Sequence, residues 1–141
     1  MTSIGQVYYN DDYREKVSTL KINIDSYENS SRFSKKDLVR IVIPEYVSYD
    51  SKRDEFEKYL IKFFYSTKND NFKRISFGPF QMQSEFILKN SNLNSYSGII
   101  KNIDSLSSIK TQYKILQNFV NNNPSLKNKE VINAVNLMVL K

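Results

Sequence analysis

The sequence predicts a mainly α-helical fold of about six helices, with little or no sheet. The chain has 141 residues, of which 40% are hydrophobic, and this is enough for one compact core. It holds only three Gly and three Pro, which are too few for a β-sandwich with many tight turns. Several segments space their apolar residues at helical intervals, and no repeat is visible. We therefore expect one domain over residues 1–141.

The first helix is expected over residues 11–28, where apolar side chains recur every three or four positions. These side chains belong to Tyr13, Val17, Leu20 and Ile24. The acidic residues at positions 11 and 12 suit the positive end of a helix. A polar cluster at residues 29–31 is expected to end this helix.

A second helix is expected to follow Ser34, which with Asp37 resembles a capping box. Residues 38–43 are strongly apolar, as in a buried central helix, although the β-branched run also suits a strand. Pro44 cannot donate an amide hydrogen bond, so we expect the helix to kink or loosen there. This would place Glu45 at an irregularity just after the most buried segment.

The clearest helical pattern follows Asp50 and Ser51, both of which can cap a helix. Its aromatic and apolar members are Phe56, Tyr59, Leu60, Phe63 and Phe64. The polar residues 66–71 are expected to end this third helix. Gly78 then marks a turn, and Pro79 is expected to be the first residue of a fourth helix.

The rest of the chain is expected to contain a loop and two further helices. The loop covers residues 90–98, which are rich in Asn and Ser. One helix carries Ile109, Tyr113, Leu116 and Val120. The other follows Pro124 and carries Val131, Ile132, Val135, Met138 and Val139.

The composition excludes several kinds of catalytic site. The chain has no His and no Cys, so it cannot form a Ser-His-Asp triad, a Cys nucleophile or a zinc site with the usual ligands. We expect no metal and no cofactor. The net charge of +6 suits polyanionic surroundings, but the basic residues are scattered, so we expect solvated helix faces and no nucleic-acid binding. No apolar run is long enough for a transmembrane segment.

Glycoside cleavage is a hydrolytic reaction that needs neither His nor Cys. A carboxylic acid can protonate the leaving oxygen when apolar surroundings raise its pKa. Glu45 has such surroundings in the sequence, since Ile43 and Pro44 precede it and Tyr46 and Val47 follow it. The residues therefore make Glu45 the candidate general acid, while a structural Glu paired with a nearby Lys is the alternative.

A later segment strengthens the case for Glu45. Residues 78–82, Gly-Pro-Phe-Gln-Met, resemble the Gly-Leu-Met-Gln motif of soluble lytic transglycosylases and goose-type lysozymes. In those families a Ser and a Gly-x-x-Gln turn follow a catalytic Glu that ends a buried helix. The Pro44-Glu45 pair and residues 76–82 also look like lysozyme-like domains of Bacteroidetes proteins. The resemblance covers about residues 34–88 and implies a lysozyme-like fold.

The resemblance also implies roles for particular residues. Glu45 matches the general acid/base, and Ser76 matches the Ser of the motif. Gln81 and the backbone from Gly78 to Phe80 match the wall that hydrogen-bonds an N-acetyl sugar. Taken alone, Gly78 and Gln81 are equally consistent with a plain helix N-terminus and a solvent-facing Gln. The aromatic side chains of Phe77, Phe80 and Phe86 are expected in the core rather than as sugar-stacking platforms.

The function that the resemblance implies is cleavage of the β-1,4 bond between N-acetylmuramic acid and N-acetylglucosamine in peptidoglycan strands. It implies a periplasmic or extracellular location, although the sequence shows no leader. Whether the reaction is that of a lytic transglycosylase or of a lysozyme-type hydrolase stays open. A hydrolase of the inverting type needs a second carboxylate, for which Asp50, Asp54 and Asp70 are the candidates.

Two departures from the family pattern keep an alternative open. The spacing from Glu45 to Ser76 is longer than is typical and implies an inserted helix. The downstream Ala-Tyr-Asn segment of the family has no clear match, because residues 133–136 read Asn-Ala-Val-Asn. The alternative is an inactive lysozyme-like domain that binds cell-wall glycan or a protein partner, or one that lacks a C-terminal segment.

Overall fold

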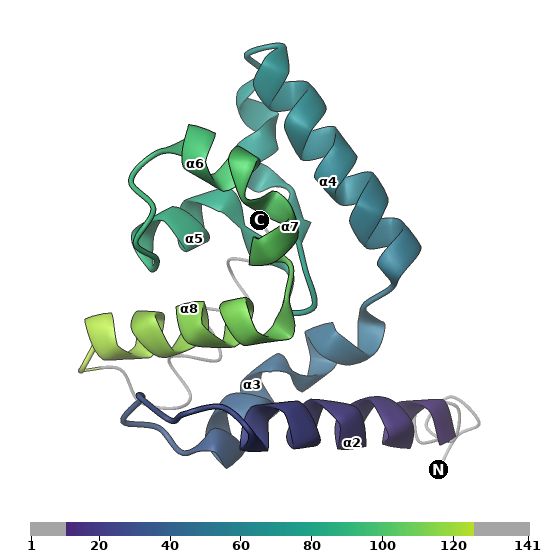
Figure 1. Cartoon of the computed structure of the whole chain (residues 1–141), viewed down its shortest axis with the longest axis vertical. Helices are drawn as coiled ribbons and strands as arrows, with labels where there is room; N and C mark the ends of the chain where they lie inside the picture. Colours follow the sequence, from purple (N-terminus) through teal and green to yellow (C-terminus); the bar gives the residue numbers. More distant parts are fainter. Residues whose placement is uncertain (1–10, 126–141) are drawn as a thin grey trace.

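The computed structural model describes residues 11–125, and this part of the chain is mainly helical, as predicted (Figure 1). Its elements, in chain order, are α2 (Asp11–Asp25), α3 (Lys35–Ser48), α4 (Ser51–Ser66), the 3-10 helix η1 (Asp70–Arg74), β1 (Ser76–Phe77), β2 (Met82–Gln83), α5 (Ser84–Lys89), α6 (Tyr96–Lys101), α7 (Ile103–Leu106) and α8 (Ile109–Asn122). The two strands form one short antiparallel hairpin. Within residues 11–125, no helix is both long enough and apolar enough to cross a membrane.

Helices α2 and α3 pack against each other, and α8 also contacts α2 (Figure 1). The predicted apolar stripe of α2 is confirmed at Leu20 and Ile24, which are fully buried. Helix α3 begins as predicted, because the Ser34 hydroxyl accepts a hydrogen bond from the Asp37 amide at 3.2 Å. The apolar run of α3 is helical rather than extended, and its buried members are Leu38, Val39, Ile41 and Val42.

Pro44 does not end the second helix. Helix α3 continues through Pro44 to Ser48, so Glu45 lies inside its last turn, after the buried segment as expected. Pro44 costs the helix one hydrogen bond, because the Arg40 carbonyl loses its usual i+4 donor. Arg40 and Pro44 both lie on the exposed side of α3, where water can bond that carbonyl.

Helix α4 starts as predicted, since the Asp50 carboxylate accepts hydrogen bonds from the Lys52 and Arg53 amides. Its aromatic stripe, however, does not enter the core. Phe56, Tyr59 and Phe63 are 60%, 61% and 48% exposed. Ile61 is fully buried and shares the buried face of α4 with two charged residues, Asp54 and Lys58. The helical period in the sequence was therefore right, but three of its five residues are exposed, while Phe64 packs against the edge of the core.

The prediction that Pro79 begins a helix is wrong. Residues 78–81 form the turn between β1 and β2, in which Ser76 pairs with Gln83 and Phe77 pairs with Met82. The Gln81 amide donates to the Gly78 carbonyl at 3.0 Å and closes this turn. Helix α5 starts only at Ser84. The turn has left-handed backbone at both ends, with φ of +83° at Gly78 and +53° at Gln81. The first turn of a helix needs right-handed backbone instead.

The second half of the described chain completes the core. The predicted loop at residues 90–98 is shorter than expected, because α6 begins at Tyr96. Helix α8 is confirmed, and Tyr113, Leu116 and Val120 are buried in it. The prediction that three Phe side chains lie in the core is also confirmed, since Phe77, Phe80 and Phe86 are 0%, 2% and 4% exposed. The helix predicted after Pro124 and the sequence at residues 133–136 lie outside the described residues.

The Gly78→Ala variant is expected to be about 1–3 kcal/mol less stable than the wild type. Gly78 has left-handed backbone, and a Cβ atom there would overlap the side-chain amide of Gln112. The control is Gly98→Ala in α6, where the nearest atom to an added Cβ is Leu93 Cδ2 at 3.4 Å. Urea unfolding should show a loss for the first variant and little change for the second. Equal stability of the two variants would contradict this account of the turn.

Candidate active site

A pocket of about 230 Å³ opens where the last turn of α3, the first half of α4 and the hairpin meet. It is lined by Glu45, Ser48, Tyr49, Asp50, Arg53, Glu57, Ser76 and Gln81. Three of the residues predicted from the sequence, Glu45, Ser76 and Gln81, are therefore brought together. They come from positions up to 36 residues apart, and only the packing of the hairpin near α3 and α4 joins them.

Glu45 presents a half-buried carboxyl group to this pocket. Burial raises the pKa of Glu45, and the positive charge of Arg53 opposes part of this rise. In the described part of the chain, the Glu45 carboxylate forms no hydrogen bond and no ion pair within 4.0 Å. A carboxyl group of this kind keeps its proton to a higher pH than an exposed one and can donate it to a bound oxygen.

Gln81 is held rigidly by its neighbours. Its side-chain oxygen accepts from the Ser76 hydroxyl at 2.9 Å, and its side-chain nitrogen donates to the Gly78 carbonyl at 3.0 Å. The same nitrogen donates to the Glu57 carboxylate at 3.3 Å. A non-Gly residue with positive φ is strained, and such strain clusters at functional sites. The alternative of a solvent-facing Gln at a helix N-terminus is therefore wrong.

Glu57 is the pocket residue that reasoning from the sequence missed. Its side chain is only 12% exposed, and its carboxylate lies 3.8 Å from Arg53 Nε. Burial raises the pKa of Glu57, the Gln81 hydrogen bond and Arg53 lower it, and Asp54 raises it. In the sequence Glu57 is one acidic residue of a charged helix, and only its contact with Gln81 distinguishes it from Glu55. No pattern along the chain signals that contact.

Gly78 and Phe80 are close to the site, but neither lines the pocket. The Gly78 amide donates to Asp54 Oδ1 at 2.6 Å, and the Phe80 amide donates to Gln112 Oε1 at 2.8 Å. Gln112 is fully buried and also donates to the Phe77 carbonyl at 3.0 Å. These two backbone amides therefore hold the hairpin in place rather than facing a ligand.

The three Asp residues considered as a second carboxylate have other roles or lie elsewhere. Asp50 lines the pocket, but one of its oxygens caps α4. Asp54 is 2% exposed and bonds the hairpin turn. Asp70 is exposed at the start of η1, 3.8 Å from Lys73, and does not line the pocket. Glu57 is thus the carboxylate best placed to act beside Glu45.

No family model, curated protein or solved structure matches this chain. What the site can do chemically must therefore follow from its own side chains. The part of the chain that the structure describes has no group of three or more acidic side chains that could hold a metal ion. The pocket instead offers one carboxyl group without a partner and a second that is held by an amide and a guanidinium.

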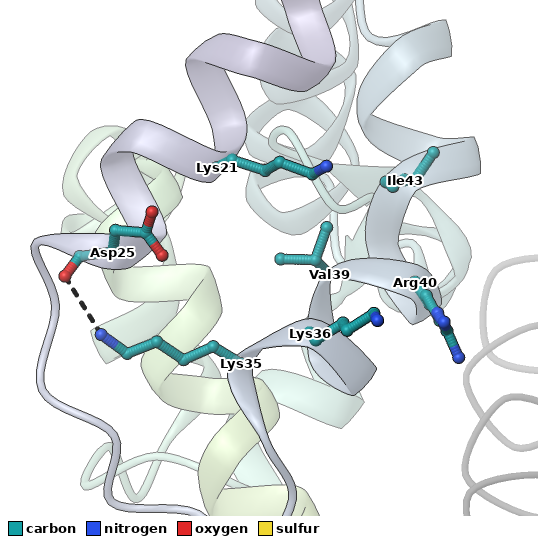
Figure 2. Close-up of a pocket in the computed structure, with 7 residues that line it drawn as sticks. All are labelled: Lys21, Asp25, Lys35, Lys36, Val39, Arg40 and Ile43. Atoms are coloured by element: carbon teal, nitrogen blue, oxygen red, sulfur yellow. Dashed lines mark hydrogen bonds between the residues drawn. The ribbon is translucent and has the colours of Figure 1, made fainter.

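A larger pocket of about 410 Å³ lies between α2 and α3 (Figure 2). Its lining residues are Lys21, Asp25, Lys35, Lys36, Val39, Arg40 and Ile43. Lys35 Nζ donates to the backbone oxygen of Asp25 at 3.1 Å. Four basic residues that are scattered in the sequence thus share one pocket. Because Asp25 is the single acidic residue in its lining, this pocket lacks the pair of carboxyl groups found beside α4.

Proposed function

We propose that the protein is a peptidoglycan-cleaving glycosidase that acts on the β-1,4 bond between N-acetylmuramic acid and N-acetylglucosamine. The observation that carries this proposal is the shared pocket of Glu45 and Gln81. It joins a desolvated carboxyl group to the Gly-x-x-Gln turn that resembles lytic transglycosylases and goose-type lysozymes. The substrate then lies in the periplasm or outside the cell, which is where we propose the protein works.

In this mechanism Glu45 protonates the glycosidic oxygen as the bond to the anomeric carbon breaks. The raised pKa of Glu45, caused by burial, favours the protonated form that this step needs. The acetamido group of the substrate stabilises the positive charge that develops on the sugar. Ser76 and Gln81 line the same pocket and contribute polar groups to the sugar near the cleaved bond.

Digestion of purified sacculi tests the proposal. The full chain and its Glu45→Gln variant are each incubated with sacculi, and the soluble products are identified by mass spectrometry. We expect soluble muropeptides from the wild type and about 10²- to 10⁴-fold slower release from the variant. No release by the wild type, or equal release by the variant, would overturn the proposal. Retention on sacculi without release would favour the alternative of a binding domain.

Replacement of Arg53 with Met is expected to extend activity to higher pH. Arg53 lowers the pKa of Glu45 by its charge, so its loss lets Glu45 hold its proton to a higher pH. The alkaline limb of the pH-rate profile should move upward. The Arg53 side chain is 68% exposed, so stability should change by less than about 1 kcal/mol. The control is Lys52→Met on the preceding exposed residue, which should leave the profile unchanged.

An Arg53→Met profile that matches the wild type would show that Arg53 does not act on the proton of Glu45. A ¹³C NMR titration of the Glu side-chain carboxyl groups gives the same information without substrate. In that measurement the signal of Glu45 should titrate at a higher pH in the variant.

A further inference from the structure

Two carboxyl groups from different helices enter the pocket beside the hairpin. Glu45 belongs to the last turn of α3, and Glu57 belongs to the middle of α4. The pocket volume of about 230 Å³ exceeds the roughly 30 Å³ that one water molecule occupies. An inverting glycosidase needs such a pair, with an acid at the glycosidic oxygen and a base that activates a water on the opposite face of the sugar.

The surroundings of the two groups differ in a way that separates their roles. Glu57 has two donors close to its oxygens, Gln81 Nε2 at 3.3 Å and Arg53 Nε at 3.8 Å. Burial raises the pKa of both groups, and Asp54 adds to the rise at Glu57. The two donors at Glu57 oppose this rise, because they favour the negatively charged carboxylate. Glu45 has no such hydrogen bond in the described part of the chain and feels Arg53 only through space. Glu57 is therefore the better base, and Glu45 is the better acid.

We infer, on the basis of the proposed function, that Glu57 is the general base that activates water for hydrolysis with inversion at the anomeric carbon. The water oxygen bonds to the anomeric carbon, and its proton moves to Glu57. The bond from that carbon to the glycosidic oxygen breaks, and this oxygen takes the proton of Glu45. Glu57 then returns a proton to Glu45 through solvent. Gln81 and Arg53 position Glu57 and oppose the rise in its pKa that burial causes.

The inference predicts which ends the products carry. Hydrolysis leaves reducing N-acetylmuramic acid ends, whereas a lytic transglycosylase leaves 1,6-anhydro ends. We expect reducing ends from the wild type and a loss of rate of about 10²- to 10⁴-fold in Glu57→Gln. Glu85→Gln is the matched control, because Glu85 is an exposed acidic residue of α5 that pairs with Lys89 and does not line the pocket. Its rate should equal that of the wild type.

A second variant separates loss of the base from loss of the fold. In Glu57→Ala the shortened side chain leaves space for azide, which needs no base and can attack the anomeric carbon. We expect sodium azide to restore bond cleavage and to give the α-glycosyl azide, whose mass and anomeric configuration can be measured. A misfolded variant would show no such rescue, so recovery of activity with the azide product supports the inference directly.

Three results would overturn the inference. Anhydro ends from the wild type would assign the reaction to the sugar's own 6-hydroxyl and leave no role for an activated water. Unchanged rate and products in Glu57→Gln would show that this carboxyl group takes no part. A folded Glu57→Ala variant, checked by circular dichroism, that azide does not rescue would also contradict it. Each of these leaves the proposed function intact, whereas absence of any release by the wild type removes the proposed function itself.

Discussion

The Glu45→Gln variant is expected to cleave glycan strands about 10²- to 10⁴-fold more slowly than the wild type. The substitution keeps the size and polarity of the side chain but removes the proton that the leaving oxygen receives. Rates of soluble product release from sacculi measure this effect. The variant should still bind sacculi, because Ser76 and Gln81 remain in the pocket. A rate within tenfold of the wild type would contradict the assignment of Glu45 as the acid.

The same variant should be at least as stable as the wild type at neutral pH. Burial raises the pKa of Glu45 above its value in the unfolded chain, so the unfolded chain gives up this proton first as pH rises. Between the unfolded pKa near 4.3 and the raised folded pKa, the wild type therefore loses stability relative to the variant. Above that pH window, the difference in unfolding free energy between the variant and the wild type is constant. Urea unfolding at several pH values between 4 and 7 checks this and shows that lost activity is not lost folding.

The Asp54→Ala variant is expected to lose about 3–5 kcal/mol of unfolding free energy. Asp54 is almost completely buried, and its carboxylate bonds the Gly78 amide at 2.6 Å and lies 3.7 Å from Lys58 Nζ. Its removal leaves a buried amide without an acceptor and takes from Lys58 its one buried partner. The midpoint of urea unfolding, with the slope checked, measures the loss.

Two further variants give this prediction its controls. Asp54→Asn keeps an oxygen for the Gly78 amide and removes only the charge, so it should be less damaging than Asp54→Ala. Asp104→Ala removes another partner of Lys58, 3.1 Å away, but this carboxylate is 78% exposed and should contribute less than about 1 kcal/mol. If Asp54→Ala lost no more unfolding free energy than Asp104→Ala, the role of Asp54 as the buried anchor of the hairpin would be disproved.

The anchor also connects stability to the candidate site. Asp54 and Glu57 lie three positions apart on α4, one bonding the start of the turn at Gly78 and the other its end at Gln81. Tyr49 also holds Asp54, because its hydroxyl donates a hydrogen bond to the Asp54 carboxylate at 3.5 Å. Loosening the turn should therefore separate Gln81 from Glu57. We expect Asp54→Ala to lower activity even at temperatures where it remains folded.

Local signals in the sequence were enough to predict most helices. The caps at Ser34 and Asp50 and the apolar spacing around Leu20 and Leu116 depend on residues within a few positions of each other. The extra hairpin and the continuation of α3 through Pro44 were not predicted. The hairpin depends on residues far away in the sequence, because Asp54 and Gln112 bond its turn. The helix continues because a proline inside a helix removes only one of its hydrogen bonds.

The sequence by itself determined a mainly helical chain, a chemistry without His or Cys, and Glu45 and Gln81 as candidates. Only the tertiary structure decided that these two share a pocket, that the Gly78 and Phe80 amides bond Asp54 and Gln112, and that the Glu57 carboxylate lines the same pocket. The physical reason is that a helical period shows which residues share a face but not which face is buried. On α4, Asp54 and Lys58 are buried beside Ile61, and the Asp54 carboxylate bonds the hairpin. Phe56, Tyr59 and Phe63 stay exposed.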